Sequence, residues 1–176
     1  KDVYTLPHVI DEAFHIAQTG RPGPVVIDVP KDVQLALSDR DYSPVVFTRN
    51  QSIDPEKIRK IAAAINGSAR PLIYAGGGIM HARAAGPLYS LARKNSIPVT
   101  LSLMGLGVFP PDDPLYLGML GMHGAPYTNY ILDEIDILLA FGARFDDRAT
   151  GKLKEFCPQA SVIHIDIDGS EIDKIR

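Results

Sequence analysis

Apolar positions recur along this chain with two different periods, which predicts a succession of helices and strands. Apolar residues between positions 9 and 17 have helical spacing, and Gly20 suits the left-handed position that often follows a helix. The next segment, PVVIDVP, has a short apolar run and ends at Pro30, which lacks the amide that a ladder needs. The chain is therefore predicted to open with a helix and a buried strand, with Lys31 at the exit of the strand.

The regular pattern fades between Leu35 and Ser52, where Ser, Asp, Arg and Pro interrupt the apolar periods. This composition predicts an interdomain linker. Asp54 and Pro55 then mark a helix start, because aspartate caps free amides and proline has no amide to lose there. The residues expected to form the buried stripe of this helix are Ile58, Ile61, Ala62 and Ile65. A second domain is predicted to begin at position 54.

Continuous apolar segments alternate with helical ones in the rest of the chain. The expected strands are PLIYA, IPVTLSL, IDILLAFG and SVIHIDID, with helices near residues 84–94 and 127–133. A long loop rich in Gly and Pro follows the second of these strands. Apolar strands separated by helices indicate parallel pairing with both sheet faces covered. The predicted fold class is α/β, with a doubly wound, mostly parallel sheet.

Composition and charge exclude several classes of partner. With 45% hydrophobic residues, the 176-residue chain can bury one sizeable core, and a formal net charge of −3 provides no basic field for nucleic acid. No apolar run reaches membrane-spanning length. We therefore expect neither nucleic acid nor a membrane as partner. The only cysteine, Cys157, favours a reducing compartment, either the cytoplasm or a plastid or mitochondrion in a eukaryote. The sequence lacks an initiator Met, and both ends are expected to be cut from a longer protein.

Candidate binding residues follow the predicted strands, where ligands of open parallel sheets bind. They comprise a triple glycine, a charged cluster, a short loop and an aspartate: Gly76, Gly77, Gly78, Arg144, Asp146, Asp147, Arg148, residues 102–105 and Asp166. Glycines let backbone amides approach an anionic diphosphate, and Asp166 can accept hydrogen bonds from a ribose. These residues together predict a dinucleotide site.

Each signal also has a structural interpretation. The glycines lack G-x-G-x-x-G spacing and can form only a tight turn, and Asp166 can cap the segment that follows it. The charged cluster can be a surface salt-bridge network, although its position at the ligand edge favours function. Lys31 can be a solvated residue, and His123 a capping or core histidine. The other histidines lack metal-ligand spacing, so no metal site is predicted, and Cys157 is expected to be inert.

Six motifs follow one another along the chain: GRPGPVVIDVPKDVQ, LIYAGGG, LMGLGVFPPDDP, LGMLGMHG, AFGARFDDRATGKL and VIHIDID. In this order they resemble the catalytic large subunits of acetolactate synthase, also called acetohydroxyacid synthase. The resemblance implies a thiamine-diphosphate enzyme whose central domain has a Rossmann-like, six-stranded sheet. It places the end of the pyrimidine-binding domain at residues 1–34, a linker at 35–53 and a central FAD-binding domain, truncated at its C-terminus, at 54–176.

The resemblance also implies an activity and its site residues. Such enzymes decarboxylate pyruvate on thiamine diphosphate and join the two-carbon unit to pyruvate or 2-oxobutyrate, on the way to branched-chain amino acids. FAD has no net redox role in that reaction. By similarity the FAD contacts are Arg21, Gly76, Gly77, Gly78, Ser102, Leu103, Leu120, Gly121, Met122, His123, Gly142, Arg144, Asp146, Asp166 and Ile167. The substrate channel corresponds to Lys31, Met122, Asp147 and Arg148. We expect Arg148 to bind the carboxylate of the second 2-oxo acid and Asp147 to orient it.

The sequence lacks two features that this family requires. These are a glutamate that activates the thiamine ring, and a Gly-Asp-Gly motif followed by asparagine that holds Mg²⁺ and the diphosphate. No catalytic residue is therefore assigned to this chain, which is expected to be inactive alone and to retain FAD weakly. The resemblance implies homodimers or homotetramers of full-length subunits and a regulatory small subunit. Two alternatives stay open: a stand-alone FAD- or ADP-binding module, and a related thiamine-diphosphate oxidase or decarboxylase.

Overall fold

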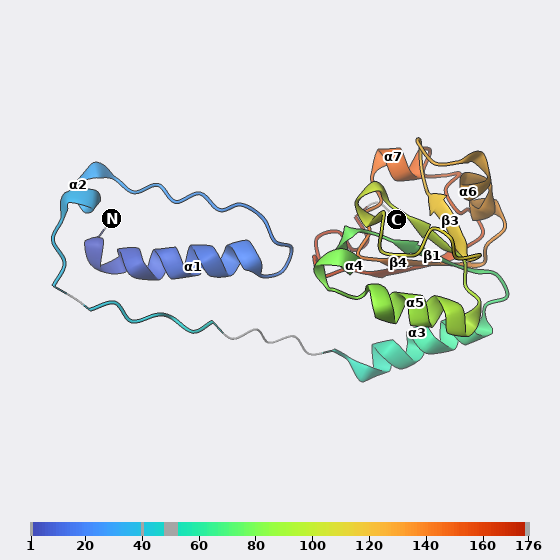
Figure 1. Ribbon diagram of the computed structural model, residues 1–176, viewed down its shortest axis with the longest axis horizontal. Coiled ribbons are helices and arrows are strands. Elements are labelled where there is room, and N and C mark those ends of the chain that lie inside the picture. The colour runs from blue at the N-terminus through green and yellow to red at the C-terminus, as the bar shows by residue number, and fades with distance from the viewer. Residues whose placement is uncertain (1, 40, 48–52, 175–176) are drawn as a thin grey trace. The chain divides into compact units, whose positions relative to one another are not determined.

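The computed structural model describes residues 2–39, 41–47 and 53–174. The chain divides into two compact units, residues 1–52 and 53–176. Figure 1 shows both as ribbons, the first in blue and cyan and the second from green to red.

The first unit is built on helix α1 (Leu6–Gln18), preceded by the short helix η1 (Val3–Thr5) and followed by α2 (Lys31–Leu35). The predicted first helix is thus confirmed, and Gly20 has the left-handed φ of 60° expected of it. Within the linker, Tyr42 donates its hydroxyl hydrogen to Asp11 at 2.6 Å, and the Phe47 ring stacks on His15. These contacts hold the described linker residues 42–47 against α1, while residues 48–52 lie outside the described part of the chain.

The strand predicted at PVVIDVP is not formed. Residues 24–30 are extended, but they have no ladder partner among residues 2–39 and 41–47, and Val26 is 92% exposed. A strand requires a neighbour that takes up its amides and carbonyl groups, and the described part of this unit contributes helices and unpaired extended segments instead. Lys31 consequently begins the short helix α2 rather than marking the exit of a strand.

The second unit contains a five-stranded parallel sheet with strand order β3-β2-β1-β4-β5. Its strands are β1 (Pro71–Ala75), β2 (Val99–Leu101), β3 (Tyr116–Met119), β4 (Ile137–Phe141) and β5 (Ser161–Ile165). Its helices are α3 (Pro55–Gly67), α4 (Gly77–His81), α5 (Ala85–Asn95), η2 (Leu103–Gly105), α6 (Pro126–Tyr130), η3 (Ile131–Asp133) and α7 (Asp147–Thr150). The order places β1 beside β4. The chain continues from β1 to β2 on one side and from β4 to β5 on the other, so a switch point lies between β1 and β4.

Most predicted elements of this unit are confirmed, with three differences. The sheet of the described residues has five strands, not the expected six. Strand β3 was missed inside the predicted loop, because this short edge strand contains Gly118, at a φ of 82°, and pairs irregularly with β2. Helix α3 starts at Pro55 with Asp54 as its cap, as predicted. The predicted buried stripe is wrong, however, because Ile61 and Ile65 are only half-buried and Ile58 and Ala62 are exposed.

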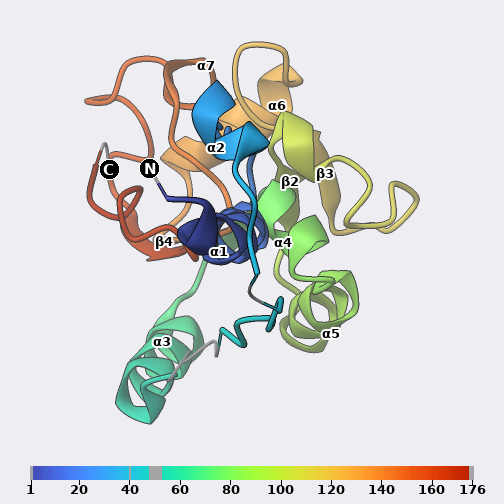
Figure 2. The same cartoon turned by 90° about the vertical axis from the view of Figure 1, so that its left-hand side faces the viewer.

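The sheet is covered on both faces, which explains its continuous apolar strands. Along β1, Leu72 and Tyr74 pack on one face against a cluster that includes Phe145 and Phe156. The alternate residues of β1 pack on the other face with Leu88 of α5. Figures 1 and 2 show α6 and α7 on one side of the sheet and α3 and α5 on the other. Burying each large apolar side chain contributes about 1.5–3 kcal/mol, so this double layer is what fixes the carboxyl edge in place.

Candidate functional site

The loops after β1, β4 and β5 are joined directly by backbone hydrogen bonds at the carboxyl edge of the sheet. The amide of Gly76 donates to the carbonyl of Phe141 at 2.9 Å, and the amide of Gly78 to Gly142 at 3.0 Å. The amide of Gly142 in turn donates to the carbonyl of Ile165 at 2.8 Å. The convergence of these predicted loops on one edge is therefore observed in the structure.

Two of the three consecutive glycines are required by this close packing. A Cβ on Gly76 would lie 2.1 Å from the carbonyl oxygen of Gly142, and a Cβ on Gly78 would lie 2.6 Å from the Cα of Gly142. Gly142 itself has a φ of 55°, which favours glycine. The tight-turn interpretation thus explains Gly76 and Gly78, whose amides already donate within the protein. The role of this loop in phosphate binding stays a prediction.

The charged residues after β4 alternate with core residues. Ala143 and Phe145 are buried, whereas Arg144 and Asp146 are exposed, because this extended segment has one face on the core. Asp146 caps α7, where its carboxylate accepts a hydrogen bond from the amide of Ala149 at 3.0 Å. The alternation sends both charged side chains to solvent at the carboxyl edge.

No ion pair holds this charged cluster together within the described residues. Arg144, Asp147 and Arg148 form none among residues 2–39, 41–47 and 53–174, so the described part of the chain contains no salt-bridge network there. Asp147 and Arg148 form no ion pair with each other among the described residues. Both side chains are exposed. That Asp147 orients or partly neutralises the guanidinium stays a prediction.

The loop after β3 docks on the first turn of α7. The amide of Met122 donates to the carbonyl of Arg148 at 2.8 Å. Gly121 has a φ of 101°, and a Cβ there would lie 2.4 Å from the same oxygen. Met122 is 71% exposed and His123 is also exposed. The fold therefore brings Met122 and Arg148, both predicted channel residues, into direct backbone contact.

Sequence reasoning missed the side chain that holds this loop. Asn129 of α6 accepts a hydrogen bond from the amide of Gly121 at 2.9 Å and donates to the carbonyl of Gly121 at 3.1 Å. A lone asparagine near a helix start resembles any turn residue, and no spacing rule connects it to a loop eight positions earlier. Only the tertiary structure identifies it.

Exposed apolar side chains accompany the polar groups at this edge. After β2, the amide of Ser102 donates to the carbonyl of Ala75 at 3.0 Å, and the next two residues, Leu103 and Met104, are 68% and 70% exposed. Ile167, after β5, is about half-exposed. Leu120, by contrast, is buried. Apolar groups left in solvent beside convergent polar ones are typical of a surface that binds a ligand or another domain.

Asp166 caps the segment that follows it, in agreement with its structural interpretation. One of its carboxylate oxygens accepts a hydrogen bond from the amide of Asp168 at 2.9 Å. Its other oxygen lies 3.9 Å from Nε2 of His164, which also approaches the carbonyl of Ala143 at 2.9 Å. Among the described residues, no hydrogen-bond donor lies closer to that second oxygen than this histidine, so the carboxylate keeps capacity for a ribose hydroxyl.

Burial and neighbouring charges perturb Tyr74 beneath this edge. Burial raises the pKa of its hydroxyl well above the ordinary value, with the negative charge of Asp146 adding to the effect and Arg144 opposing it. The ring packs on Phe145 with centroids 6.0 Å apart. Tyr74 is therefore a packing residue under the charged cluster, and burial favours its neutral form.

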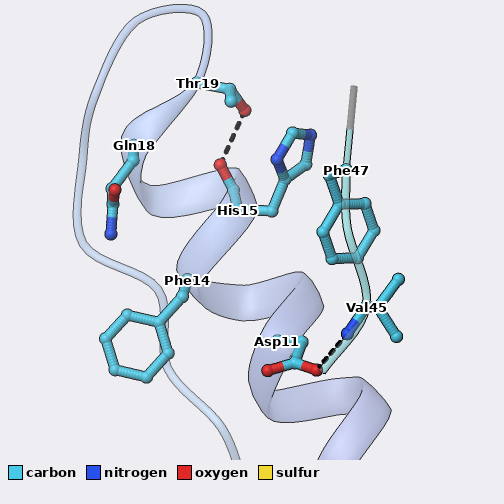
Figure 3. A pocket seen from close by; sticks show the side chains of 7 residues that line it. All are labelled: Asp11, Phe14, His15, Gln18, Thr19, Val45 and Phe47. Atoms are coloured by element: carbon cyan, nitrogen blue, oxygen red, sulfur yellow. Dashed lines mark hydrogen bonds between the residues drawn. The ribbon is translucent and has the colours of Figure 1, made fainter. Parts of the chain in front are cut away.

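Arg21 and Lys31 belong to the first unit, where both are exposed. Their grouping with the residues of the second unit stays a prediction. Figure 3 shows a pocket of about 430 Å³ between α1 and residues 45–47, which contains none of the predicted site residues. Another pocket, of about 470 Å³, lies between α6, η3 and α7 and is lined by Met122, Asp147 and Arg148 among others. Three of the four predicted channel residues, Met122, Asp147 and Arg148, thus border a concave surface of the second unit.

Residues 2–39, 41–47 and 53–174 contain no group of three or more His, Cys, Asp or Glu side chains suited to a metal ion. The same residues contain no helix with the length and apolar character that crossing a membrane demands.

Comparison with known proteins gives these residues a context. The profile of the family "Thiamine pyrophosphate enzyme, central domain" matches residues 58–176. The chain is 49% identical over its whole length to the acetolactate synthase isozyme 1 large subunit of Escherichia coli K12, of which it covers 31%. It is 46% identical over 98% of its length to acetolactate synthase 2, chloroplastic, of Zea mays, covering 28% of that protein. These matches confirm the resemblance found in the motifs.

The chain therefore spans about a third or less of the curated relatives that it matches. Among solved structures, a putative thiamin diphosphate-dependent enzyme from Mycobacterium smegmatis aligns with a TM-score of 0.66 over 81% of this chain and 28% of that one. At 24% sequence identity, this likeness supports the α/β fold alone.

Proposed function

Because the chain belongs to the family of thiamine pyrophosphate enzyme central domains, we propose that it is a segment of an acetolactate synthase catalytic large subunit. The full-length protein would condense two pyruvates to 2-acetolactate with loss of CO2, or pyruvate with 2-oxobutyrate to 2-aceto-2-hydroxybutyrate. One observation carries the proposal: Arg148, exposed and without an ion-pair partner among the described residues, is tied to Met122 at the ligand edge of the sheet. The identity of 43–49% to synthase large subunits supports it.

Arg148 is the proposed site for the carboxylate of the second 2-oxo acid. A guanidinium can donate two parallel hydrogen bonds to a planar carboxylate, which fixes both the position and the orientation of the acid. Met122, beside it, offers an adaptable apolar wall for the alkyl end. Lys31 and Asp147 complete the proposed channel set, and Asp147 contributes charge rather than a direct contact with the arginine.

The carboxyl edge also fits FAD. The exposed apolar residues Leu103, Met122 and Ile167 suit a flat ring system, and Asp166 retains an oxygen for ribose hydroxyls. Two amides of the triple glycine are already used, which leaves the diphosphate to Gly77 and to the guanidinium of Arg144. The other proposed contacts within the second unit shape the edge or line it, namely Gly76, Gly78, Ser102, Leu120, Gly121, His123, Gly142 and Asp146. Arg21, in the first unit, is proposed as a contact from the resemblance alone.

Thiamine diphosphate, when bound with Mg²⁺, supplies the carbanion chemistry of the reaction, and its proposed ligands lie outside this chain. The residues present here bind and orient the flavin and the second oxo acid. We accordingly assign no catalytic residue to the chain and propose that it is inactive alone. Residues 1–34 would belong to the pyrimidine-binding domain and residues 35–53 to the linker. The relatives named large subunits support a regulatory small subunit as partner, with dimers or tetramers of the full-length subunit.

The test is product analysis with the full-length protein that contains this segment. Supplied with pyruvate, thiamine diphosphate, Mg²⁺ and FAD, it is expected to form acetolactate, and with added 2-oxobutyrate the corresponding hydroxy acid. Acetate or acetaldehyde as main product would indicate an oxidase or a decarboxylase instead. Flavin or ADP binding without any turnover would indicate a stand-alone binding module.

A further inference from the structure

The loop that carries Met122 and His123 is fixed at one residue, Gly121. Asn129 accepts a hydrogen bond from the amide of Gly121 at 2.9 Å and donates one to its carbonyl oxygen at 3.1 Å. The same carbonyl accepts from the amide of Gly124 at 2.9 Å, which closes the loop on itself. Both backbone polar groups of Gly121 are thus engaged by one side chain.

Gly121, the residue that Asn129 holds, packs against the backbone of Arg148. Gly121 is buried and has no room for a Cβ, which would lie 2.4 Å from the carbonyl oxygen of Arg148. The adjacent amide of Met122 donates to that same oxygen at 2.8 Å. Any shift of Gly121 is therefore transmitted to the backbone of Arg148 at the start of α7.

Asn129 is itself firmly anchored. Its amide group also donates to the carbonyl of Ala125 at 3.2 Å, across the first turn of α6. The preceding residue, Thr128, is fully buried and donates its hydroxyl hydrogen to the carbonyl of Leu117 in β3. Helix α6 is thus pinned to the edge of the sheet, and Asn129 transfers that fixed position to the loop.

We propose that Asn129 is a positioning residue of the substrate site: it holds Gly121 against α7 and so sets the place of the Arg148 guanidinium relative to Met122. This role deepens the proposed function and rests on it, because Arg148 there receives the second oxo acid. Asn129 acts through the backbone and does not touch the substrate.

The test uses the full-length enzyme with two substitutions. Asn129→Leu has a similar size and removes all three hydrogen bonds, which leaves the amide of Gly121 without its acceptor. Asn129→Asp keeps the acceptor for that amide but places a carboxylate against two carbonyl oxygens. A matched control is Asn95→Leu at the end of α5, which loses one side-chain hydrogen bond to Leu91 on another part of the unit.

Two readouts are measured for each variant: hydrogen exchange of peptides covering residues 118–124 and 147–150, and KM for 2-oxobutyrate alongside kcat. Asn129→Leu is expected to speed exchange in both peptides and to raise KM about tenfold, the effect of leaving a partly buried polar group unpaired. Asn129→Asp is expected to give a smaller change of the same kind, and Asn95→Leu to leave both readouts unchanged.

If Asn129→Leu left hydrogen exchange in residues 147–150 unchanged, the proposal would be overturned. A lowered melting temperature of this variant with an unaltered KM would overturn it as well, because a purely structural role produces that result. The exchange readout does not depend on turnover. If the wild-type enzyme formed no acetolactate, the proposed function would be wrong. Hydrogen exchange in α7 of the Asn129 variants would still show whether Asn129 positions Arg148.

Discussion

Met122 donates its backbone amide hydrogen to the carbonyl oxygen of Arg148 at 2.8 Å. This bond joins the loop after β3 to the first turn of α7, and it is backed by the close approach of Gly121 to the same oxygen. Both residues are exposed, and both line the same concave surface of the second unit. The backbone contact thus ties two predicted channel residues from separate loops to one place at the carboxyl edge of the sheet.

Arg148→Lys in the full-length enzyme is expected to weaken use of the second oxo acid. Lysine keeps the charge but loses the two parallel donors, and charge-assisted hydrogen bonds of this kind are worth about 1.5–3 kcal/mol. We expect the KM for 2-oxobutyrate to rise about 10- to 100-fold, measured by steady-state kinetics. Arg93→Lys is the control, since Arg93 faces Asp113 at 3.6 Å away from this site. Equal effects of both substitutions would contradict the assignment of Arg148.

Gly76→Ala is expected to destabilise the second unit by about 1–3 kcal/mol, the usual cost of overpacking. Its Cβ would lie 2.1 Å from the carbonyl oxygen of Gly142, a backbone atom that can yield only if two loops separate. Thermal unfolding monitored by circular dichroism measures the change. Gly86→Ala in α5 is the matched control: a Cβ there meets nothing within 4 Å, and stability should rise slightly. A neutral Gly76→Ala would show that the loops are not tightly packed.

Asp136 is expected to make stability depend on acid pH. Its carboxylate accepts hydrogen bonds from the Ser68 hydroxyl and from the amides of Ala69 and Arg70, which hold its pKa below the ordinary 3.8. The stabilisation is present above that ordinary value and is lost as the pH falls through the lower folded-state pKa.

Asp136→Asn should lower the melting temperature at neutral pH and flatten its decline in acid, followed by thermal scans between pH 7 and pH 2. Asp112→Asn, in an exposed loop, serves as the control and should leave the acid decline as it is in the wild type. If the melting temperature of Asp136→Asn fell as steeply in acid as that of the wild type, the hydrogen bonds of Asp136 would not be the source of the pH dependence.

The isolated 176-residue chain is expected to retain little FAD and to form no acetolactate. The exposed side chains of Leu103, Met104 and Met122 leave the proposed flavin surface open to solvent, so binding energy is lost relative to an enclosed site. Absorbance near the flavin bands after gel filtration measures occupancy, with the full-length protein as reference. A yellow chain with stoichiometric flavin would contradict this expectation.

The helices and strands with strong local apolar periodicity could be predicted from the sequence, and those without it could not. Strands β1, β4 and β5 and helices α1, α3 and α5 were found from the sequence because their apolar periods are long and uninterrupted. Strand β3 was missed because its pairing with β2, not its own composition, makes it a strand. The strand predicted at PVVIDVP is wrong for the opposite reason. Its composition is that of a strand, but the described residues of its unit provide no strand to pair with it.

The candidate site divides in a similar way. The sequence indicated the triple glycine and the charged cluster, because both follow strands whose carboxyl ends must share an edge. It could not indicate that Asp147 and Arg148 remain unpaired with each other, which depends on side-chain directions at the start of α7. Asn129 was missed because its three hydrogen bonds reach a loop that only the packing of α6 on β3 brings near.

By itself the sequence determined the α/β class, the parallel sheet of the second unit and the edge at which its candidate site residues gather. Periodicity and chain direction are local properties, and they suffice for these conclusions. Tertiary structure alone decided which glycines are required by backbone contact, which charges stay unpaired among the described residues and which asparagine holds the loop. Those outcomes depend on distances of a few ångströms between segments far apart in the chain, which no local pattern encodes.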